Sequence, residues 1–325
     1  MNVLITGGCG FIGSHLVDYH MSKGHCVQVV DDLSTGRLDN IVQFKNDPNF
    51  SFHEADILTW PALESAISWA DRIYHMAAVV GVYRVIAEPI QVLNTNTLSC
   101  ERLLRLARQS GHKPRILIAS SSEVYGQGVN TAFSETDDLL IEPAAHSRWN
   151  YAISKLSNEA FGLSYAQQYG LPVTLLRLFN TVGARQSGHY GMVLPRFVEQ
   201  AVSQQPITVY GNGQQSRSFC DVRDTVEALD RLANQALSIG EVVNVGNDKE
   251  ISINALAELV KQIAHSHSPI THIPYQEAYG GEVFVDIQRR KPDLEKFYKL
   301  TAYQHRWSLK ETIEDLVQRK RTDQL

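Results

Sequence analysis

The sequence lacks the features of a disulfide-rich, metal-stapled or membrane-spanning protein. Only four cysteines occur among 325 residues, and Cys9, Cys26, Cys100 and Cys220 form no CxxC pair. Neither a disulfide framework nor a metal site is therefore predicted. No apolar run approaches the roughly 18 residues that a membrane-spanning helix needs, and the N-terminal residues resemble a strand rather than a signal peptide. We therefore expect a cytoplasmic protein that makes no contact with a membrane.

An excess of basic residues is also missing. The 30 Lys and Arg residues are outnumbered by 35 Asp and Glu residues, which gives a formal net charge of -5. Nothing in this balance predicts a nucleic-acid partner. Hydrophobic residues make up 43% of the chain, so one large domain or two closely packed domains are expected.

The first half of the chain alternates short β-rich runs with longer helical patterns. This alternation predicts an α/β fold, a doubly wound parallel sheet with helices on both faces. The predicted strands are Val3–Thr6, Val27–Asp31, Ser51–Glu54, Arg72–His75, Arg115–Ala119 and Val173–Leu178. The predicted helices are Phe11–Ser22, Ala62–Trp69, Ile90–Gln109 and Asn150–Tyr169.

After Leu178 this rhythm loosens and glycines become frequent, which indicates loops and turns. We expect residues 1–179 to form a larger domain and residues 180–325 a smaller α/β lobe. A helix over Asp224–Ala236 followed by a strand over Val242–Val245 would return residues 224–246 to the larger domain.

A glycine-rich turn follows the first predicted strand and opens the first predicted helix. Its sequence is Gly7-Gly8-Cys9-Gly10-Phe11-Ile12-Gly13, in which glycines permit a tight turn and a close approach to a pyrophosphate at a helix N-terminus. The next strand ends at Asp31-Asp32, where a carboxylate would accept hydrogen bonds from an adenosine ribose and repel a 2′-phosphate. Asp56, after the third strand, is placed to hold the adenine amino group. The pattern predicts NAD rather than NADP.

A serine, a glutamate, a tyrosine and a lysine form the candidate reaction centre. Ser121 and Glu123 follow the fifth strand, and Tyr151 and Lys155 lie four residues apart on a predicted helix. A Lys ammonium one turn away is expected to lower the pKa of Tyr151, so that the phenolate can take a proton from an alcohol while a hydride leaves its carbon. Glu123 adds a second acid or base, which simple alcohol oxidation does not require.

With these motifs placed, the chain resembles the nucleotide-sugar epimerases, dehydratases and decarboxylases of the extended short-chain dehydrogenase/reductase family. The resemblance includes the glycine turn, Met76-Ala77-Ala78, the Ser121, Tyr151 and Lys155 trio, Arg177-Leu178-Phe179-Asn180, and the segment from Val209 to Arg217. It implies a Rossmann domain for NAD and a lobe that binds a nucleoside-diphosphate sugar. The implied NAD-binding residues are Gly7, Gly10, Phe11, Ile12, Gly13, Asp31, Asp32, Asp56, Ile57, Ala77, Ala78, Asn96, Tyr151 and Lys155.

The same resemblance implies where the sugar nucleotide binds. Asn180 and Arg217 are expected at its diphosphate and Tyr210 near its base, and the implied substrate-binding residues are Ser122, Arg148, Asn180, Val193, Tyr210, Arg217 and Arg290. It also implies a homodimer through the helices at 90–109 and 150–169, and a substrate that is UDP-linked.

Ser121-Ser122-Glu123 resembles the Thr-Ser-Glu of UDP-glucuronate decarboxylases and of sugar 4,6-dehydratases, and differs from simple 4-epimerases. Two further features favour the decarboxylases: Arg148 precedes Tyr151 by three residues, and Arg290 lies in an Arg-Lys-Pro segment. In this interpretation Tyr151 takes the proton of the carbon-4 hydroxyl while the hydride passes to NAD, Arg290 orients a carboxylate, and Glu123 protonates carbon 5 directly or through water. A 4-epimerase, a 4,6-dehydratase and a non-catalytic NAD sensor remain alternatives. For Glu123 a structural ion pair, and for Arg290 a solvated charge, also remain open.

Overall fold

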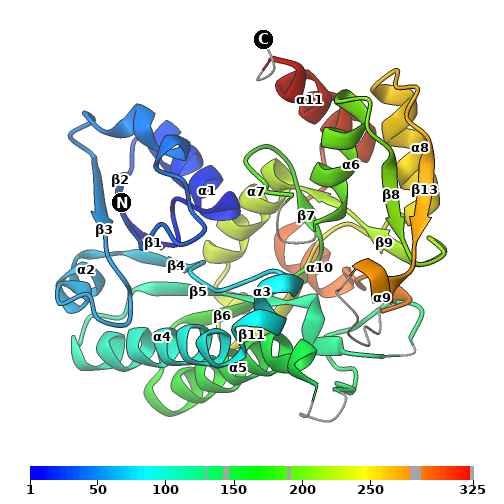
Figure 1. Ribbon diagram of the computed structural model, residues 1–325. Coiled ribbons are helices and arrows are strands. Elements are labelled where there is room, and N and C mark those ends of the chain that lie inside the picture. The colour runs from blue at the N-terminus through cyan, green and yellow to red at the C-terminus, as the bar shows by residue number, and fades with distance from the viewer. Residues whose placement is uncertain (129, 142–145, 189–191, 279–286, 323–325) are drawn as a thin grey trace.

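Seven parallel strands form the central sheet of the computed structural model, which describes residues 1–128, 130–141, 146–188, 192–278 and 287–322 (Figure 1). The strand order is β11-β6-β5-β4-β1-β2-β3, so the direction of winding reverses beside β1. The strands are β1 (Asn2–Thr6), β2 (Cys26–Asp31), β3 (Phe50–Glu54), β4 (Arg72–His75), β5 (Arg115–Ser121), β6 (Val173–Leu178) and β11 (Glu241–Val245). The predicted doubly wound sheet is confirmed.

Helices cover both faces of this sheet. In Figure 1, α1 and α7 lie on one face, and α4 and α5 lie on the other. Helix α2 packs with α4 and also contacts β1. The bounds of the five helices are α1 (Phe11–Ser22), α2 (Leu63–Trp69), α4 (Pro89–Gln109), α5 (Asn150–Tyr169) and α7 (Val222–Ala233). Local chemistry sets several of these ends: α4 begins with a proline in its first turn, and α5 stops at Gly170, which adopts a left-handed conformation.

The helix predicted over Asp224–Ala236 is displaced toward the N-terminus. Helix α7 spans Val222–Ala233 because the Asp221 side chain caps it by accepting a hydrogen bond from the Arg223 backbone N–H. The next strand, β11, pairs in parallel with β6 at the edge of the central sheet. The division of the chain at residue 180 stays a prediction.

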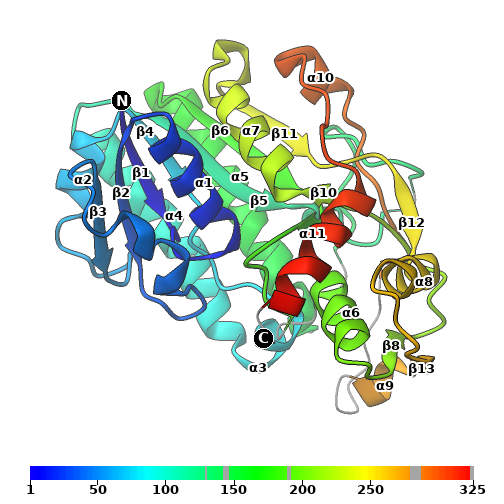
Figure 2. The same ribbon diagram turned by 90° about the horizontal axis from the view of Figure 1, so that it is seen from above.

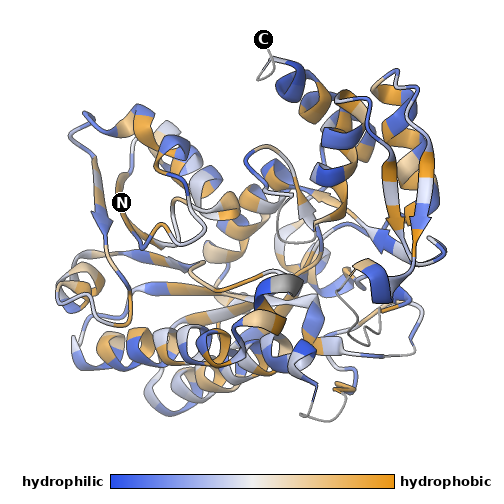
Figure 3. Cartoon of the chain, viewed as in Figure 1, coloured by the Kyte–Doolittle hydropathy of each residue, from blue (hydrophilic) through white to orange (hydrophobic). Residues whose placement is uncertain are grey.

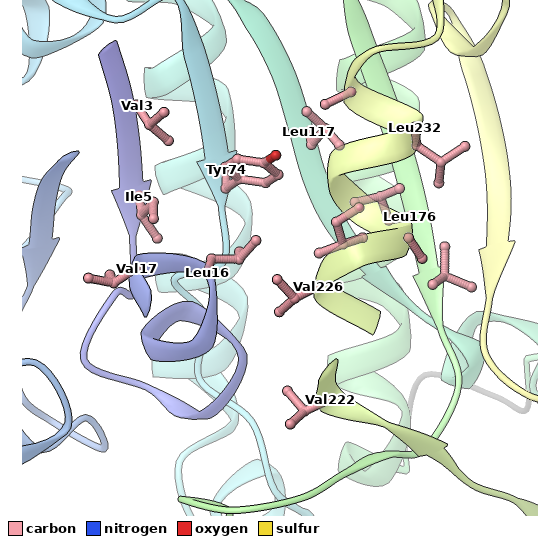
Figure 4. Packing of buried hydrophobic residues seen from close by; sticks show 14 of the residues in the cluster. Val3, Ile5, Leu16, Val17, Tyr74, Leu117, Leu176, Val222, Val226 and Leu232 are labelled. Carbon is pink, nitrogen blue, oxygen red and sulfur yellow. The ribbon is translucent and has the colours of Figure 1, made fainter. Parts of the chain in front are cut away.

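Two hydrophobic clusters fill the space between the sheet and its helices. One joins Leu16 and Val17 of α1 and Val226 of α7 to Ile5 and Tyr74 on the sheet (Figure 4). The other packs α2, α4 and α5 against the opposite face, with Leu63, Ile67, Leu103 and Leu104 fully buried. Val3-Leu4-Ile5 of β1 and Ile116-Leu117-Ile118 of β5 are fully buried in the sheet, which explains these short apolar runs. Hydrophobic and hydrophilic residues alternate along the helices that cover the sheet (Figure 3).

A smaller lobe lies beside the carboxyl ends of the central strands (Figure 2). Its core joins α6, α8 and α11 through Leu194, Phe197, Leu256 and Ile313. Within the described residues, three small sheets have the orders β10-β7, β12-β9-β14 and β13-β8. The remaining elements are α3 (Val82–Ala87), α6 (Val193–Val202), α8 (Ile253–Ile263), α9 (Tyr275–Ala278), α10 (Glu295–Thr301), α11 (Leu309–Thr322), β7 (Thr181–Val182), β8 (Ile207–Tyr210), β9 (Ser216–Ser218), β10 (Cys220–Asp221), β12 (Glu250–Ser252), β13 (Ile270–Ile273) and β14 (Arg289–Arg290), with short 3-10 helices η3 (Ser122–Tyr125) and η4 (Ser147–Trp149) near the site.

The described residues contain neither a membrane-spanning helix nor a cluster of metal-binding side chains. No helix in this part of the chain has the length and apolar character needed to cross a bilayer. Within the same residues, no group of three or more His, Cys, Asp or Glu side chains is arranged to hold a metal ion.

Candidate active site

A cavity of about 470 Å³ lies at the carboxyl ends of β1, β4, β5 and β6 and extends to residues of the smaller lobe. This is where ligands bind in open α/β sheets. Every site residue predicted from the sequence lines this cavity, with the exception of Asn96. The structure therefore brings together segments from both halves of the chain.

The glycine turn forms one end of the cavity and fits a dinucleotide pyrophosphate. Gly7 has a positive φ of 72°, and a Cβ atom there would lie 2.7 Å from the backbone nitrogen of Ala77. A Cβ atom on Gly13 would lie 2.0 Å from the carbonyl oxygen of Gly7. A side chain at either position would collide with the backbone and displace the turn at the α1 N-terminus, where backbone N–H groups attract an anion.

Three carboxylates stand near this end of the cavity. Asp31 is buried and accepts hydrogen bonds from the backbone N–H groups of Leu33 and Cys9, both at 2.9 Å. Burial nevertheless raises the pKa of Asp31 above its usual range. Asp32 and Asp56 are exposed and each accepts a hydrogen bond from the backbone two residues later. All three line the cavity, as an adenosine-binding end requires.

Asn96 was predicted to contact the cofactor, but the structure places it behind the cavity wall. It is fully buried, and its side chain accepts a hydrogen bond from the N–H of Val79 and donates to the Val79 carbonyl and to Ser154 Oγ. Because the described contacts occupy both ends of its carboxamide, Asn96 holds the wall segment at Val79 in place.

Ser121, Tyr151 and Lys155 meet where β5 ends and α5 begins its second turn. Lys155 is 3% exposed, its Nζ donates to the Ala119 carbonyl at 2.8 Å, and it lies 5.7 Å from the centre of the Tyr151 ring. Ser121 also accepts a hydrogen bond from the Glu123 backbone N–H at 3.3 Å, which fixes the start of η3. The predicted trio is therefore assembled in space.

The ionisation of this trio differs from the prediction. Burial and the neighbouring Glu123 carboxylate raise the pKa of Tyr151, although a hydrogen bond with Ser121 and the charge of Arg290 oppose this change. Burial also lowers the pKa of Lys155 to about 8. Lys155 alone therefore does not bring the pKa of Tyr151 toward neutrality, because the cost of burying a phenolate is larger.

Glu123 lies between two arginines that come from different parts of the chain. Its carboxylate contacts Arg148 Nη1 at 2.7 Å and Arg290 Nη2 at 2.6 Å, and all three side chains are at most 14% exposed. Despite burial, these two guanidinium groups lower the pKa of Glu123 to about 2. The ion pair considered as an alternative for Glu123 is present, and Arg290 is not a solvated charge.

The other end of the cavity belongs to the smaller lobe. Arg217 on β9 is paired in register with Arg290 on β14, so both side chains project from the same face of that sheet. Asn180 donates from Nδ2 to the Ser218 carbonyl at 2.9 Å, and Val193 opens α6. The Tyr210 ring lies 3.9 Å from the guanidinium carbon of Arg196. Ser122, on the β5 side, is almost fully buried.

Several lining residues were not predicted. Gln215 donates to Tyr275 Oη at 2.8 Å and to the Tyr210 carbonyl at 3.2 Å, and together these residues line the lobe end of the cavity. Arg196 and Gln186 also line it. Their separation in sequence gives no local spacing from which this grouping could be inferred.

Comparisons with known proteins show which family this chain resembles in sequence. A family model described as the NAD dependent epimerase/dehydratase family matches residues 3–246. A UDP-N-acetyl-alpha-D-glucosaminuronate decarboxylase of Bacillus cytotoxicus is 35% identical over 316 residues, which cover 97% of this chain and 96% of that protein. A UDP-glucuronic acid decarboxylase 1 of Danio rerio is 34% identical over 326 residues, which cover 97% of this chain and 72% of that protein.

A solved structure gives the same result for the fold. The UDP-glucose 4-epimerase of Thermotoga maritima, determined with UDP-glucose, matches with a TM-score of 0.89 and 28% identity over 100% of both chains. The family resemblance and the prediction of an enzyme are confirmed. The chain belongs to the NAD dependent epimerase/dehydratase family.

Proposed function

We propose that this chain is an NAD-dependent decarboxylase of a UDP-linked uronic acid, with UDP-glucuronate as the first candidate substrate. The observation that carries the proposal is the contact of Arg290 with Glu123 on the cavity wall. A guanidinium has five N–H donors, and within the described part of the chain Nε of Arg290 has no acceptor. Arg290 therefore retains capacity for a second carboxylate beside Glu123.

The charge of the cluster supports the same substrate class. Glu123, Arg148 and Arg290 together carry two positive charges and one negative charge. The carboxylate of a uronic acid compensates such a positive site, whereas the hydroxymethyl group of a neutral hexose does not. Two relatives that cover nearly the whole chain are uronate decarboxylases by name, which also supports the proposal.

The first step is oxidation of sugar carbon 4. Tyr151 takes the proton of the carbon-4 hydroxyl, and Ser121 shares that proton through its hydrogen bond with Tyr151. NAD, held by the glycine turn and Asp31, would supply the hydride acceptor for carbon 4 and the hydride donor at the end of the cycle. Lys155, which is held by the Ala119 carbonyl, supplies positive charge below Tyr151.

Oxidation makes the substrate a β-keto acid, because carbon 5 carries the carboxylate and carbon 4 is now a ketone. Arg290 orients the carboxylate while carbon dioxide leaves and an enolate forms. The enolate then takes a proton at carbon 5. Glu123 contacts Arg290 at 2.6 Å, and a substrate carboxylate that shares Arg290 raises the pKa of Glu123 by adding negative charge and by weakening its ion pair.

Proton NMR of the purified protein with NAD and UDP-glucuronate tests the proposal. UDP-xylose or a UDP-4-keto-pentose is the expected product, with release of carbon dioxide. UDP-galacturonate would instead show a 4-epimerase, and an unchanged spectrum would exclude UDP-glucuronate as a substrate. UDP-N-acetylglucosaminuronate and UDP-glucose, run in parallel, distinguish a second uronate from a neutral hexose.

We further propose that the protein is a homodimer that pairs α4 and α5 with those of a second copy. Ile90 and Leu98 on α4 are 73% and 51% exposed, and their spacing of about two turns puts them on one face. Light scattering after gel filtration should give twice the chain mass, and Leu98→Glu should shift it to the monomer. A monomeric mass for the unchanged protein would exclude this assembly.

A further inference from the structure

Behind the cavity lies a hydrogen-bonded network of five buried residues: Ser120, Tyr125, Glu159, Arg177 and Asn244. Glu159 lies one turn after Lys155 on α5 and accepts hydrogen bonds from Ser120 Oγ at 2.6 Å and from Arg177 Nε at 2.9 Å. Arg177 Nη2 also donates to Glu159 at 2.8 Å, which makes the pair bidentate. Ser120 lines the cavity, whereas Tyr125, Glu159, Arg177 and Asn244 do not.

The network continues from Arg177 to the segment that follows Arg290. The guanidinium carbon of Arg177 lies 4.7 Å from the centre of the Tyr125 ring, and Tyr125 Oη donates to Asn244 Oδ1 at 2.7 Å. Asn244 Nδ2 donates to the carbonyls of Phe133 at 2.8 Å and Asp293 at 3.2 Å.

Phe133 completes this connection with two backbone hydrogen bonds. Its N–H donates to the Lys291 carbonyl and its carbonyl accepts from the Asp293 N–H, both at 2.8 Å. Its ring also stacks on Tyr125, with ring centres 4.7 Å apart. The chain immediately after Arg290 is thus fixed to Tyr125, which lies two residues after Glu123.

We propose that Tyr125 and Asn244 are positioning residues that hold Glu123 and Arg290 in register with Tyr151. The network connects all three segments that carry reacting groups: α5 with Tyr151, η3 with Glu123, and the chain beside Arg290. Stability alone does not require the ion pair at its centre, because buried ion pairs are often replaced by apolar residues without loss of stability. A fixed geometry does require it, because each hydrogen bond specifies one arrangement of its partners.

Tyr125→Phe tests this proposal, which rests on the proposed function. The change removes one hydroxyl, keeps the ring on Phe133 and cuts the link to Asn244. We expect kcat for UDP-glucuronate to fall on the order of 10- to 100-fold, because small misplacements of reacting groups lower the rate by this much. Affinity for UDP should stay unchanged, and a larger share of product should leave as the 4-keto pentose, because protonation and hydride return need the same alignment.

Tyr74→Phe is the matched control. Tyr74 is also fully buried, and its hydroxyl accepts a hydrogen bond from Arg72, but it does not line the cavity. Both variants should lose some thermal stability, and only Tyr125→Phe should change kcat and the product ratio. Unchanged kcat and product ratio in Tyr125→Phe would overturn the proposal, as would equal changes in both variants.

A second variant covers the case in which Tyr125→Phe does not fold. Glu159→Leu combined with Arg177→Met removes the ion pair without leaving a buried charge unpaired, and it should show the same rise in 4-keto product. A wild-type product ratio in this double variant would contradict the role of the network. If the unchanged protein releases no carbon dioxide from UDP-glucuronate, the proposed function fails. The network is then tested by oxidation of UDP-glucose at carbon 4, which is measured through the absorbance of the reduced nicotinamide.

Discussion

Replacing Arg290 by alanine should impair binding of the uronic acid far more than binding of the nucleotide. Arg290 Nη2 lies 2.6 Å from Glu123, and both side chains are at most 14% exposed, so solvent screens this position weakly. A hydrogen bond to a charged group contributes about 1.5–3 kcal/mol, equivalent to roughly 10- to 150-fold in affinity. The variant also leaves Glu123, with one arginine fewer, facing the substrate carboxylate. We therefore expect the affinity for UDP-glucuronate to fall by about 100-fold, near the upper end of this range.

Calorimetric titration of the NAD-loaded protein with UDP-glucuronate and with UDP measures this difference. UDP has no carboxylate and should bind the variant as it binds the unchanged protein. Arg289→Ala is the matched control, because Arg289 lies on the same strand but pairs with Glu250 outside the cavity. An equal loss of affinity for both ligands, or no loss for UDP-glucuronate, would refute the role given to Arg290.

Three further predictions concern the cofactor turn and two titrating groups. Gly13→Ala should abolish NAD binding, measured as bound cofactor after purification, because its Cβ would lie 2.0 Å from the Gly7 carbonyl oxygen; a normal cofactor content would contradict this. Turnover should fall as pH rises through about 8, where the Lys155 ammonium is lost, and Lys155→Arg should not show this decline in the same pH series. The depressed pKa of Glu123 stabilises the fold above pH 4.5 by roughly 3 kcal/mol, and this contribution is lost as pH falls toward about 2; denaturant titrations should show no such change for Glu123→Gln.

The central sheet could be predicted because its determinants are local. Buried parallel strands have continuous apolar sequences, and the helices between them have their own period and end signals, such as Gly170 after α5. The short strands β9, β12 and β14 have no such pattern. Each pairs with a segment far away in sequence, and pairing between distant segments leaves no local period to detect.

The candidate site also contains residues that could be predicted from local spacing and residues that could not. The glycine turn and the Tyr151 and Lys155 pair were predictable, because their chemistry depends on spacing within one turn or one helix. Asn96 was assigned to the cofactor, although its polar atoms hold Val79 and Ser154. Gln215 and Tyr275 were missed, because they meet only after the smaller lobe has folded.

The ionisation of Glu123 and Tyr151 shows why position alone does not determine chemistry. Glu123 is held as an anion by Arg148 and Arg290, and its charge in turn raises the pKa of Tyr151. These two effects are coupled through one carboxylate. A substrate carboxylate that takes over Arg290 favours protonation of Glu123, and a protonated Glu123 no longer opposes ionisation of Tyr151. In the proposed reaction, binding of the uronic acid therefore prepares the acid for carbon 5 and eases formation of the base for carbon 4. A neutral hexose leaves the ion pair intact and does neither.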